Sequence, residues 1–157
     1  MEDVKVVERD TTQYVMVCLG EEKYGIDIMN IDNIVRMQQM TRVPKAQEYV
    51  NGVINLRGEV VPVMSIRKKM HLAEDEITKA TRIIILKLEQ YGTIGVLVDE
   101  VIGVVTIDNS LVEKVTYDLE DDTEVFISGV GKLDDGLISL LDLNLVLREK
   151  DAEKENS

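Results

Sequence analysis

The side chains that could do chemistry are few in this sequence, and they do not converge on one segment. The only histidine, His71, follows two lysines and a methionine, where an exposed side chain is expected. The only cysteine, Cys18, lies in an apolar run, where a buried and unreactive thiol is expected. It cannot form an internal disulfide. The motifs of serine hydrolases, P-loop nucleotide-binding proteins and zinc proteases are missing. We therefore expect no catalytic residue and no cofactor.

Acidic residues are the next candidates for chemistry. The pair Asp99-Glu100 and the run Glu120-Asp121-Asp122 carry carboxylates, but the run lacks the spacing and the glycine of a calcium loop. A solvated acidic loop explains the run better, so no metal site is expected. The formal net charge of −12 disfavours binding to nucleic-acid phosphates and to an anionic membrane surface. It permits binding to a basic patch on another protein.

Arg57 is the side chain whose position points most clearly to recognition. It stands with Gly58 between the apolar runs 49–56 and 59–66, which is the pattern of a tight β-hairpin. At such a turn an arginine projects from the rim of a sheet and offers a planar set of donors to carboxylates or carbonyls. A turn arginine alone is usually only solvated, so the surrounding elements decide its interpretation.

Those elements are mostly strands. Short runs rich in apolar residues at 13–19, 23–28, 82–88, 93–98 and 101–107 predict buried strands. Residues 27–35 predict a helical turn that passes into a strand, residues 67–72 a short helix or turn, and Asp134-Asp135-Gly136 a second hairpin. No apolar run approaches the roughly 20 residues needed to span a bilayer, and the N-terminus lacks the apolar core of a secretion signal. A cytoplasmic location is therefore expected.

The pattern restarts after the polar segment 75–80. Gly25-Ile26-Asp27-Ile28 corresponds to Gly95-Val96-Leu97-Val98, and residues 52–56 correspond to 129–133. We predict two related β units, approximately 13–70 and 82–141, that pack together because each is too small to bury a large core alone. Strands that are apolar on both faces suit small barrels. A single sandwich with accidental similarity is the alternative.

Several of these motifs, taken in chain order, resemble the CheW-like family of chemotaxis coupling proteins. They are Tyr24-Gly25-Ile26-Asp27-Ile28, Thr41-Arg42-Val43-Pro44, Gly52-Val53-Ile54-Asn55-Leu56-Arg57-Gly58 and Val61-Pro62-Val63, with second-half matches at 95–99, 129–130 and 138–143. The resemblance implies a mainly β fold of two pseudo-repeated, intertwined SH3-like five-stranded barrels packed together, with short helices that include a C-terminal helix at 142–148. It implies a single domain at 12–149 between flexible tails at 1–11 and 149–157.

The resemblance also implies a function, that of an adaptor which is not an enzyme. Such an adaptor couples methyl-accepting chemoreceptors to the regulatory domain of the CheA histidine kinase, in receptor arrays at the inner face of the membrane, where it could join the kinase in rings. The receptor's helical hairpin tip would dock in the groove between the barrels, on Ile31, Ile34, Gly52, Arg57, Val98, Val101 and Val104. The kinase would contact Thr41, Arg42 and Val43 on a different face.

One position departs from the family pattern, and several alternatives stay open. Where the family often has an acidic residue before isoleucine, this chain has Asn33-Ile34, with Asp32 one place earlier. The isoleucines and valines could be barrel core rather than contacts. The chain could serve a different motility or signalling pathway, be a fragment of a larger signalling enzyme, or be a β-barrel that binds a small ligand.

Overall fold

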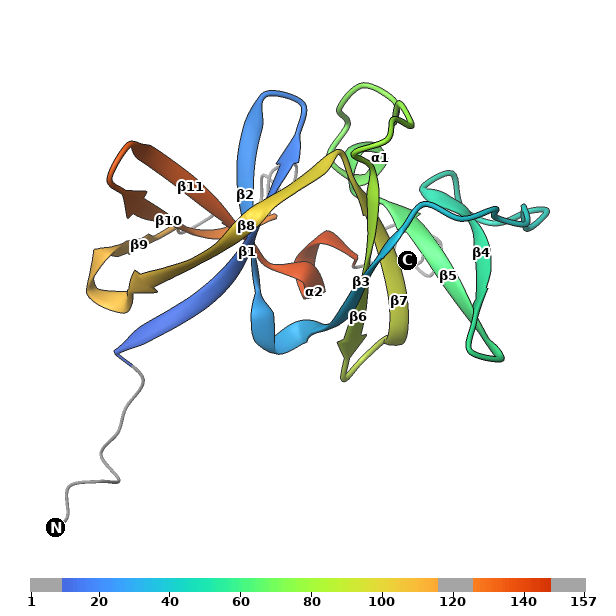
Figure 1. Cartoon of the computed structure of the whole chain (residues 1–157), viewed down its shortest axis with the longest axis horizontal. Coiled ribbons are helices and arrows are strands. Elements are labelled where there is room, and N and C mark those ends of the chain that lie inside the picture. Colours follow the sequence, from blue (N-terminus) through green and yellow to red (C-terminus); the bar gives the residue numbers. More distant parts are fainter. Residues whose placement is uncertain (1–9, 116–125, 148–157) are drawn as a thin grey trace, which may run out of the picture.

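A computed structural model describes residues 10–115 and 126–147 of the chain and shows two β-sheets side by side (Figure 1). Sheet A has six strands in the order β8-β1-β2-β11-β10-β9. Its strands are β1 (Thr11–Leu19), β2 (Glu22–Asp27), β8 (Glu100–Asp108), β9 (Val112–Lys114), β10 (Ile127–Leu133) and β11 (Gly136–Leu141). All its strand pairs are antiparallel except β2 with β11.

Sheet B has five strands in the order β3-β6-β7-β5-β4. Its strands are β3 (Ile31–Arg36), β4 (Val50–Leu56), β5 (Glu59–Ser65), β6 (Arg82–Leu88) and β7 (Gly92–Val98). Its one parallel pair joins β5 to β7. The short helices are η2 (Ile28–Asn30), α1 (Ile66–Lys69), η3 (Asn109–Leu111) and α2 (Leu143–Val146). The prediction of a mainly β fold with two packed units is confirmed, with six strands rather than five in sheet A.

The strand pairing shows how the two units predicted at 13–70 and 82–141 are intertwined. The two consecutive units exchange their first hairpins: β1–β2 joins sheet A, which is otherwise built from the second unit, and β6–β7 joins sheet B. Parallel pairs complete each exchange, with Gly25 opposite Leu140 and Gly95 opposite Val63. Sequence similarity identifies equivalent positions, but it does not report which strands pair, so the division along the chain does not correspond to the sheets.

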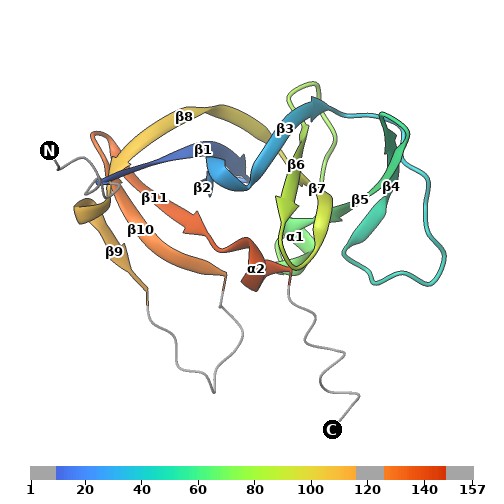
Figure 2. The ribbon, with the colours of Figure 1, turned by 90° about the horizontal axis from the view of Figure 1, so that it is seen from below.

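The largest apolar core lies between the two sheets. It combines side chains of sheet A such as Val17 and Ile26 with side chains of sheet B such as Ile84 and Val96, all fully buried. Helix α2 lies between the sheets in both views, and its Leu143 and Val146 belong to this core (Figures 1 and 2). Each sheet also has one smaller apolar core of its own. Side chains such as Val61 and Ile85 form that of sheet B, and side chains such as Ile107 and Ile138 form that of sheet A. The seam between the sheets is therefore packed by the chain itself, and only its rim is open to a partner.

The remaining expectations are met in part. The C-terminal helix predicted at 142–148 is found as α2, with Asp142 as its N-cap. The predicted tails and the acidic loop at 117–124 lie outside the described residues, except that Thr11, assigned to the first tail, begins β1. The Cys18 side chain is half-buried rather than buried. No helix in the described part of the chain is long and apolar enough to cross a membrane.

Candidate protein-binding site

Strand β3 forms one edge of sheet B and carries the first group of candidate contacts. It follows η2, whose start is fixed by the Asp27 carboxylate accepting a hydrogen bond from the Met29 amide at 2.9 Å. The register of β3 against β6 is irregular after Ile31 and places Ile34 opposite Ile84. Ile84 is buried in the core between the sheets, whereas Ile34 is 37% exposed. Ile34 therefore lies at the open rim of the seam, with the half-buried Ile31 packed on the core beside it.

Arg57 occupies the predicted two-residue turn between β4 and β5. Arg57 and Gly58 have φ values of 55° and 83°, as the favoured hairpin turns require, and the Asn55 side chain accepts a hydrogen bond from the Gly58 amide at 3.1 Å. The Arg57 side chain is exposed. With the Asn33 amide oriented to satisfy both of its groups, Arg57 Nη2 donates to Asn33 Oδ1 at 3.1 Å. The turn is thereby joined to β3.

Asn33 links Arg57 to a carboxylate. In the same orientation its Nδ2 donates to Asp32 Oδ2 at 3.1 Å, and Asp32 also lies 3.7 Å from the ammonium group of Lys87. At position 33 an amide therefore stands between Arg57 and the Asp32 carboxylate. Because Arg57 gives one described hydrogen bond, through Nη2, most of its five N–H donors are left for another molecule.

Strand β8 supplies the second group, at the edge of sheet A. Figures 1 and 2 show β8 and β3 on the same face of the molecule. Val104 is 56% exposed and Val101 is half-buried against the core. Ile102 is 42% exposed and is not among the contacts predicted from the sequence, although alternation along the strand places it beside Val104 on one face.

Two residues assigned to the receptor cannot contact a partner directly. Val98 is 1% exposed and belongs to the core between the sheets. Gly52 is buried beneath the segment that precedes β4, and a Cβ atom built on it would lie 2.7 Å from the Thr41 carbonyl oxygen. Its φ of +156° also disfavours any other residue. Gly52 therefore allows residues 41–43 to approach β4, and both receptor assignments were wrong.

The segment Thr41 to Val43 runs along β4, the other edge strand of sheet B. Thr41 and Val53 exchange two backbone hydrogen bonds of 2.9 Å. The side chains of Thr41, Arg42 and Val43 are all exposed. The structure therefore keeps these three residues together and on a strand edge different from that of Ile34 and Ile31.

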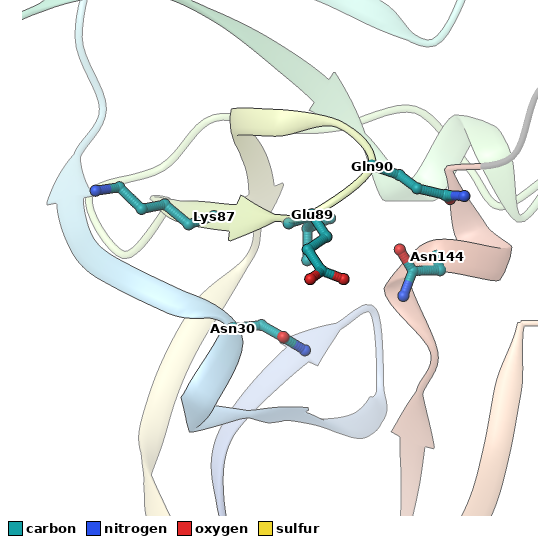
Figure 3. Close-up of a pocket in the computed structure, with 6 residues that line it drawn as sticks. Asn30, Lys87, Glu89, Gln90 and Asn144 are labelled. Atoms are coloured by element: carbon teal, nitrogen blue, oxygen red, sulfur yellow. The ribbon is translucent and has the colours of Figure 1, made fainter.

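An open polar hollow of about 540 Å³ lies where η2, the β6–β7 turn and α2 meet (Figure 3). It is lined by Asn30, Lys87, Leu88, Glu89, Gln90 and Asn144. The Glu89 carboxylate points into the space between Asn30 and Asn144. Among the described residues, no group of three or more histidine, cysteine, aspartate or glutamate side chains is placed to hold a metal ion.

A second arginine, Arg67 on α1, lies at the junction of the two sheets. Its Nε and Nη2 donate to the two carboxylate oxygens of Asp99 at 3.1 and 2.6 Å, and its Nη1 donates to the Ala73 carbonyl at 3.0 Å. Asp99 joins β7 of sheet B to β8 of sheet A and also accepts a hydrogen bond from the Gly20 amide at 2.7 Å. This Arg67–Asp99 pair, with Gly20, ties both sheets and the β1–β2 turn together.

The electrostatics of Asp99 follow from these contacts. Burial opposes its ionisation, but the hydrogen bonds from Arg67 and the Gly20 amide, together with the charge of Arg67, hold the pKa of Asp99 below its usual value. The same carboxylate raises the pKa of Arg67, although burial of the guanidinium acts in the opposite direction. Both groups are therefore ionised at neutral pH, and each satisfies the other.

The two sheets, with exposed aliphatic side chains on β3 and β8 and an exposed arginine at the β4–β5 turn, are the features of a mainly β domain with a candidate protein-binding surface. A family model described as the CheW-like domain matches residues 13–151, and the chain belongs to this family. The chemotaxis protein CheW of Bacillus subtilis is 35% identical over 139 residues, which is 88% of each chain. The CheW protein of Thermotoga maritima is 33% identical over 135 residues, covering 83% of this chain and 84% of the relative.

A solved structure extends the similarity to three dimensions. The crystal structure of the scaffolding protein TtCheW from Thermoanaerobacter tengcongensis matches with a TM-score of 0.78 and 30% sequence identity. The match covers 88% of this chain and 93% of the solved chain. The CheW-like resemblance identified from the motifs is therefore confirmed at the level of family and fold.

Proposed function

We propose that this chain is a chemotaxis coupling adaptor that joins methyl-accepting chemoreceptors to the CheA histidine kinase and has no catalytic turnover of its own. The observation that carries the proposal is the family match over 13–151, to relatives named as CheW proteins. In this role the chain works in the cytoplasm, is recruited to receptor arrays at the membrane, and transmits signal through contacts alone. It could form rings there with the kinase.

The receptor site of the proposal is the rim of the seam between the sheets. A helical hairpin laid against exposed aliphatic side chains is a common mode of recognition. Ile31 and Ile34 on β3 and Val101 and Val104 on β8 supply the apolar contact, and Ile102 extends it. Arg57 supplies donors at the edge of this surface. A contact of about 800 Å² on each partner is enough for specific binding.

The kinase site of the proposal is the exposed segment of Thr41, Arg42 and Val43, which runs beside β4. Its support is that these residues lie along β4, whereas Ile31 and Ile34 of the receptor site lie on β3, at the opposite edge of sheet B. Val43, which is 42% exposed, offers the apolar contact, and Arg42 offers a charge.

The test compares two charge reversals on these two surfaces. We expect Arg57→Glu to weaken co-sedimentation with receptor-containing membranes by about tenfold or more, because it removes donors and adds a repulsive charge. Its binding to the regulatory domain of CheA should stay within about twofold of wild type. Arg42→Glu is the matched control and should show the opposite pattern. Receptor binding by Arg57→Glu at the wild-type level, with the fold intact by thermal melting, would remove Arg57 from the site.

A further inference from the structure

Two arginines face each other across sheet B. The register of β3 against β6 places Arg36 directly opposite Arg82. Opposed residues in an antiparallel pair have Cβ atoms roughly 5 Å apart, and like charges in such a pair are destabilising. The pair also concentrates positive charge in a chain whose formal net charge is −12. An unfavourable arrangement of this kind is explained if another molecule supplies the missing negative charge.

Neither guanidinium is neutralised by the described part of the chain. Arg82 Nη1 donates to the carbonyls of Lys79 and Thr81 at 2.8 and 2.9 Å, which holds the side chain in place and leaves Nε and Nη2 as available donors. Arg36 is exposed. No described carboxylate forms an ion pair with either arginine.

The nearby acidic groups are already engaged. Asp99 follows Val98, the residue of β7 that pairs with Arg82. Its carboxylate already accepts hydrogen bonds from Arg67 and from the Gly20 amide. Asp32, on the same strand as Arg36, accepts from Asn33 and lies near Lys87. An acidic side chain from outside would therefore meet two guanidinium groups without competing with either carboxylate.

The arginine pair continues the proposed receptor surface. Ile34 and Arg36 are two residues apart on β3, so they share one face of sheet B. Their partners on β6 are Ile84 and Arg82, and Arg82 pairs in turn with Val98 on β7. Ile84 and Val98 belong to the core between the sheets, so this face looks toward sheet A. The arginine pair is therefore the next pair after Ile34 and Ile84 on this face of the sheet, and it lies at the same rim.

We propose that Arg36 and Arg82 form a carboxylate-binding pair that recognises an acidic side chain of the receptor's helical hairpin, next to the apolar contact through Ile34. This proposal rests on the proposed receptor-coupling function. Two guanidinium forks can bind one carboxylate with charge-assisted hydrogen bonds, and the bound carboxylate removes the repulsion between them. The pair would fix the position of the hairpin along the rim, which an apolar contact alone does not do.

The test measures binding of the full chain to a soluble fragment that contains the hairpin tip of a chemoreceptor from the same organism. We expect Arg36→Gln to weaken binding by about tenfold at low salt and Arg36→Glu to weaken it further, with both losses shrinking at high salt. Lys114→Gln, an equal change of charge at an exposed position on β9 of sheet A, is the matched control and should bind as wild type. Thermal melting confirms that each variant is folded.

A charge swap identifies the receptor side chain. Each exposed aspartate and glutamate of the hairpin is replaced in turn by lysine, and one replacement should restore binding to Arg36→Glu while weakening binding to wild type. Wild-type binding by Arg36→Glu, or the absence of any restoring replacement, would overturn the pairing. Arg57→Glu is measured in the same assay: if it binds weakly while Arg36→Glu binds normally, only this inference fails. If the wild-type chain does not bind the hairpin, the proposed function fails with it.

Discussion

Arg57 and Arg67 lie ten positions apart in the sequence, and the fold uses them in opposite ways. Arg67 is 12% exposed, gives two hydrogen bonds to a carboxylate and one to a backbone carbonyl, and joins the two sheets. Arg57 is exposed at a hairpin turn and gives its one described hydrogen bond to a neutral amide. A guanidinium whose donors are satisfied inside the molecule serves the fold, whereas one with free donors at a rim is available to a partner.

The different roles of the two arginines follow from their positions in the fold. Arg67 is in α1, the helix that follows β5 of sheet B, and it reaches the Asp99 linker that carries the chain from sheet B to sheet A. Three segments converge there, so water is largely excluded and hydrogen bonds to charge are strong. Arg57 is at the tip of a hairpin, where solvent competes for every donor. Loss of each arginine should therefore affect different properties of the protein.

The largest expected effect belongs to Arg67→Ala. The substitution leaves the Asp99 carboxylate, 27% exposed, with only the Gly20 amide as a described partner. Removing one member of a largely buried pair costs about 3 kcal/mol of unfolding free energy. Urea unfolding of both proteins measures this loss directly. Arg57→Ala is the matched control, and it should change the unfolding free energy by less than about 0.5 kcal/mol because its pair is exposed.

A smaller effect should appear in how the stability lost in Arg67→Ala depends on pH. The folded state holds the pKa of Asp99 below its usual value, so the unfolded chain takes up this proton first as the pH falls. The stabilisation is complete above the unfolded pKa of about 4 and is lost as the pH falls through the folded pKa. In Arg67→Ala the pKa is no longer lowered by the guanidinium. The stability difference between wild type and Arg67→Ala should therefore narrow from neutral pH to acid in urea titrations.

A constant difference across that pH range would show that Arg67 stabilises the chain through packing rather than through the Asp99 charge. Other carboxylates titrate in the same window, and comparing the two proteins at each pH removes the contribution of those that do not contact Arg67. The same comparison for Arg57→Ala should give no change with pH that exceeds the error of the measurement, since its described partner is an amide.

Local pattern explains which features could be predicted from the sequence. The strand predicted at 82–88 and the hairpin turn at Arg57-Gly58 are found as expected, because apolar runs and turn residues act over a few positions. Strand β9 was missed because three residues give too short a pattern. The family resemblance implies intertwined barrels, but the division into consecutive units does not report which hairpins are exchanged, because parallel pairs such as Gly95 with Val63 join distant segments.

The candidate site shows the same limit. Val98 is assigned to the receptor groove by the family resemblance, but an apolar residue at the end of a strand gives no sign of which side is covered, and Val98 is core. The Arg67–Asp99 pair was not predicted, since 32 positions separate its members and neither residue stands in a recognisable motif. Arg57 could be singled out because its turn signal and its neighbouring motif coincide in one short segment.

The smallest predicted effect is that of Asn33→Asp, which gives Arg57 the kind of partner that Arg67 already has. The new carboxylate would lie within reach of Arg57 Nη2 but next to Asp32, so attraction and repulsion nearly offset each other on an exposed surface. We expect the unfolding free energy to change by less than about 0.5 kcal/mol in urea, and the change to vanish at high salt. Asn33→Ser is the neutral control.

A salt-resistant gain in unfolding free energy of more than about 1.5 kcal/mol, of the size of a charge-assisted hydrogen bond, would mean that Arg57 can be fixed by the fold as firmly as Arg67. The separation between a structural and a recognition arginine would then be a consequence of one amide at position 33, rather than of exposure at the hairpin tip.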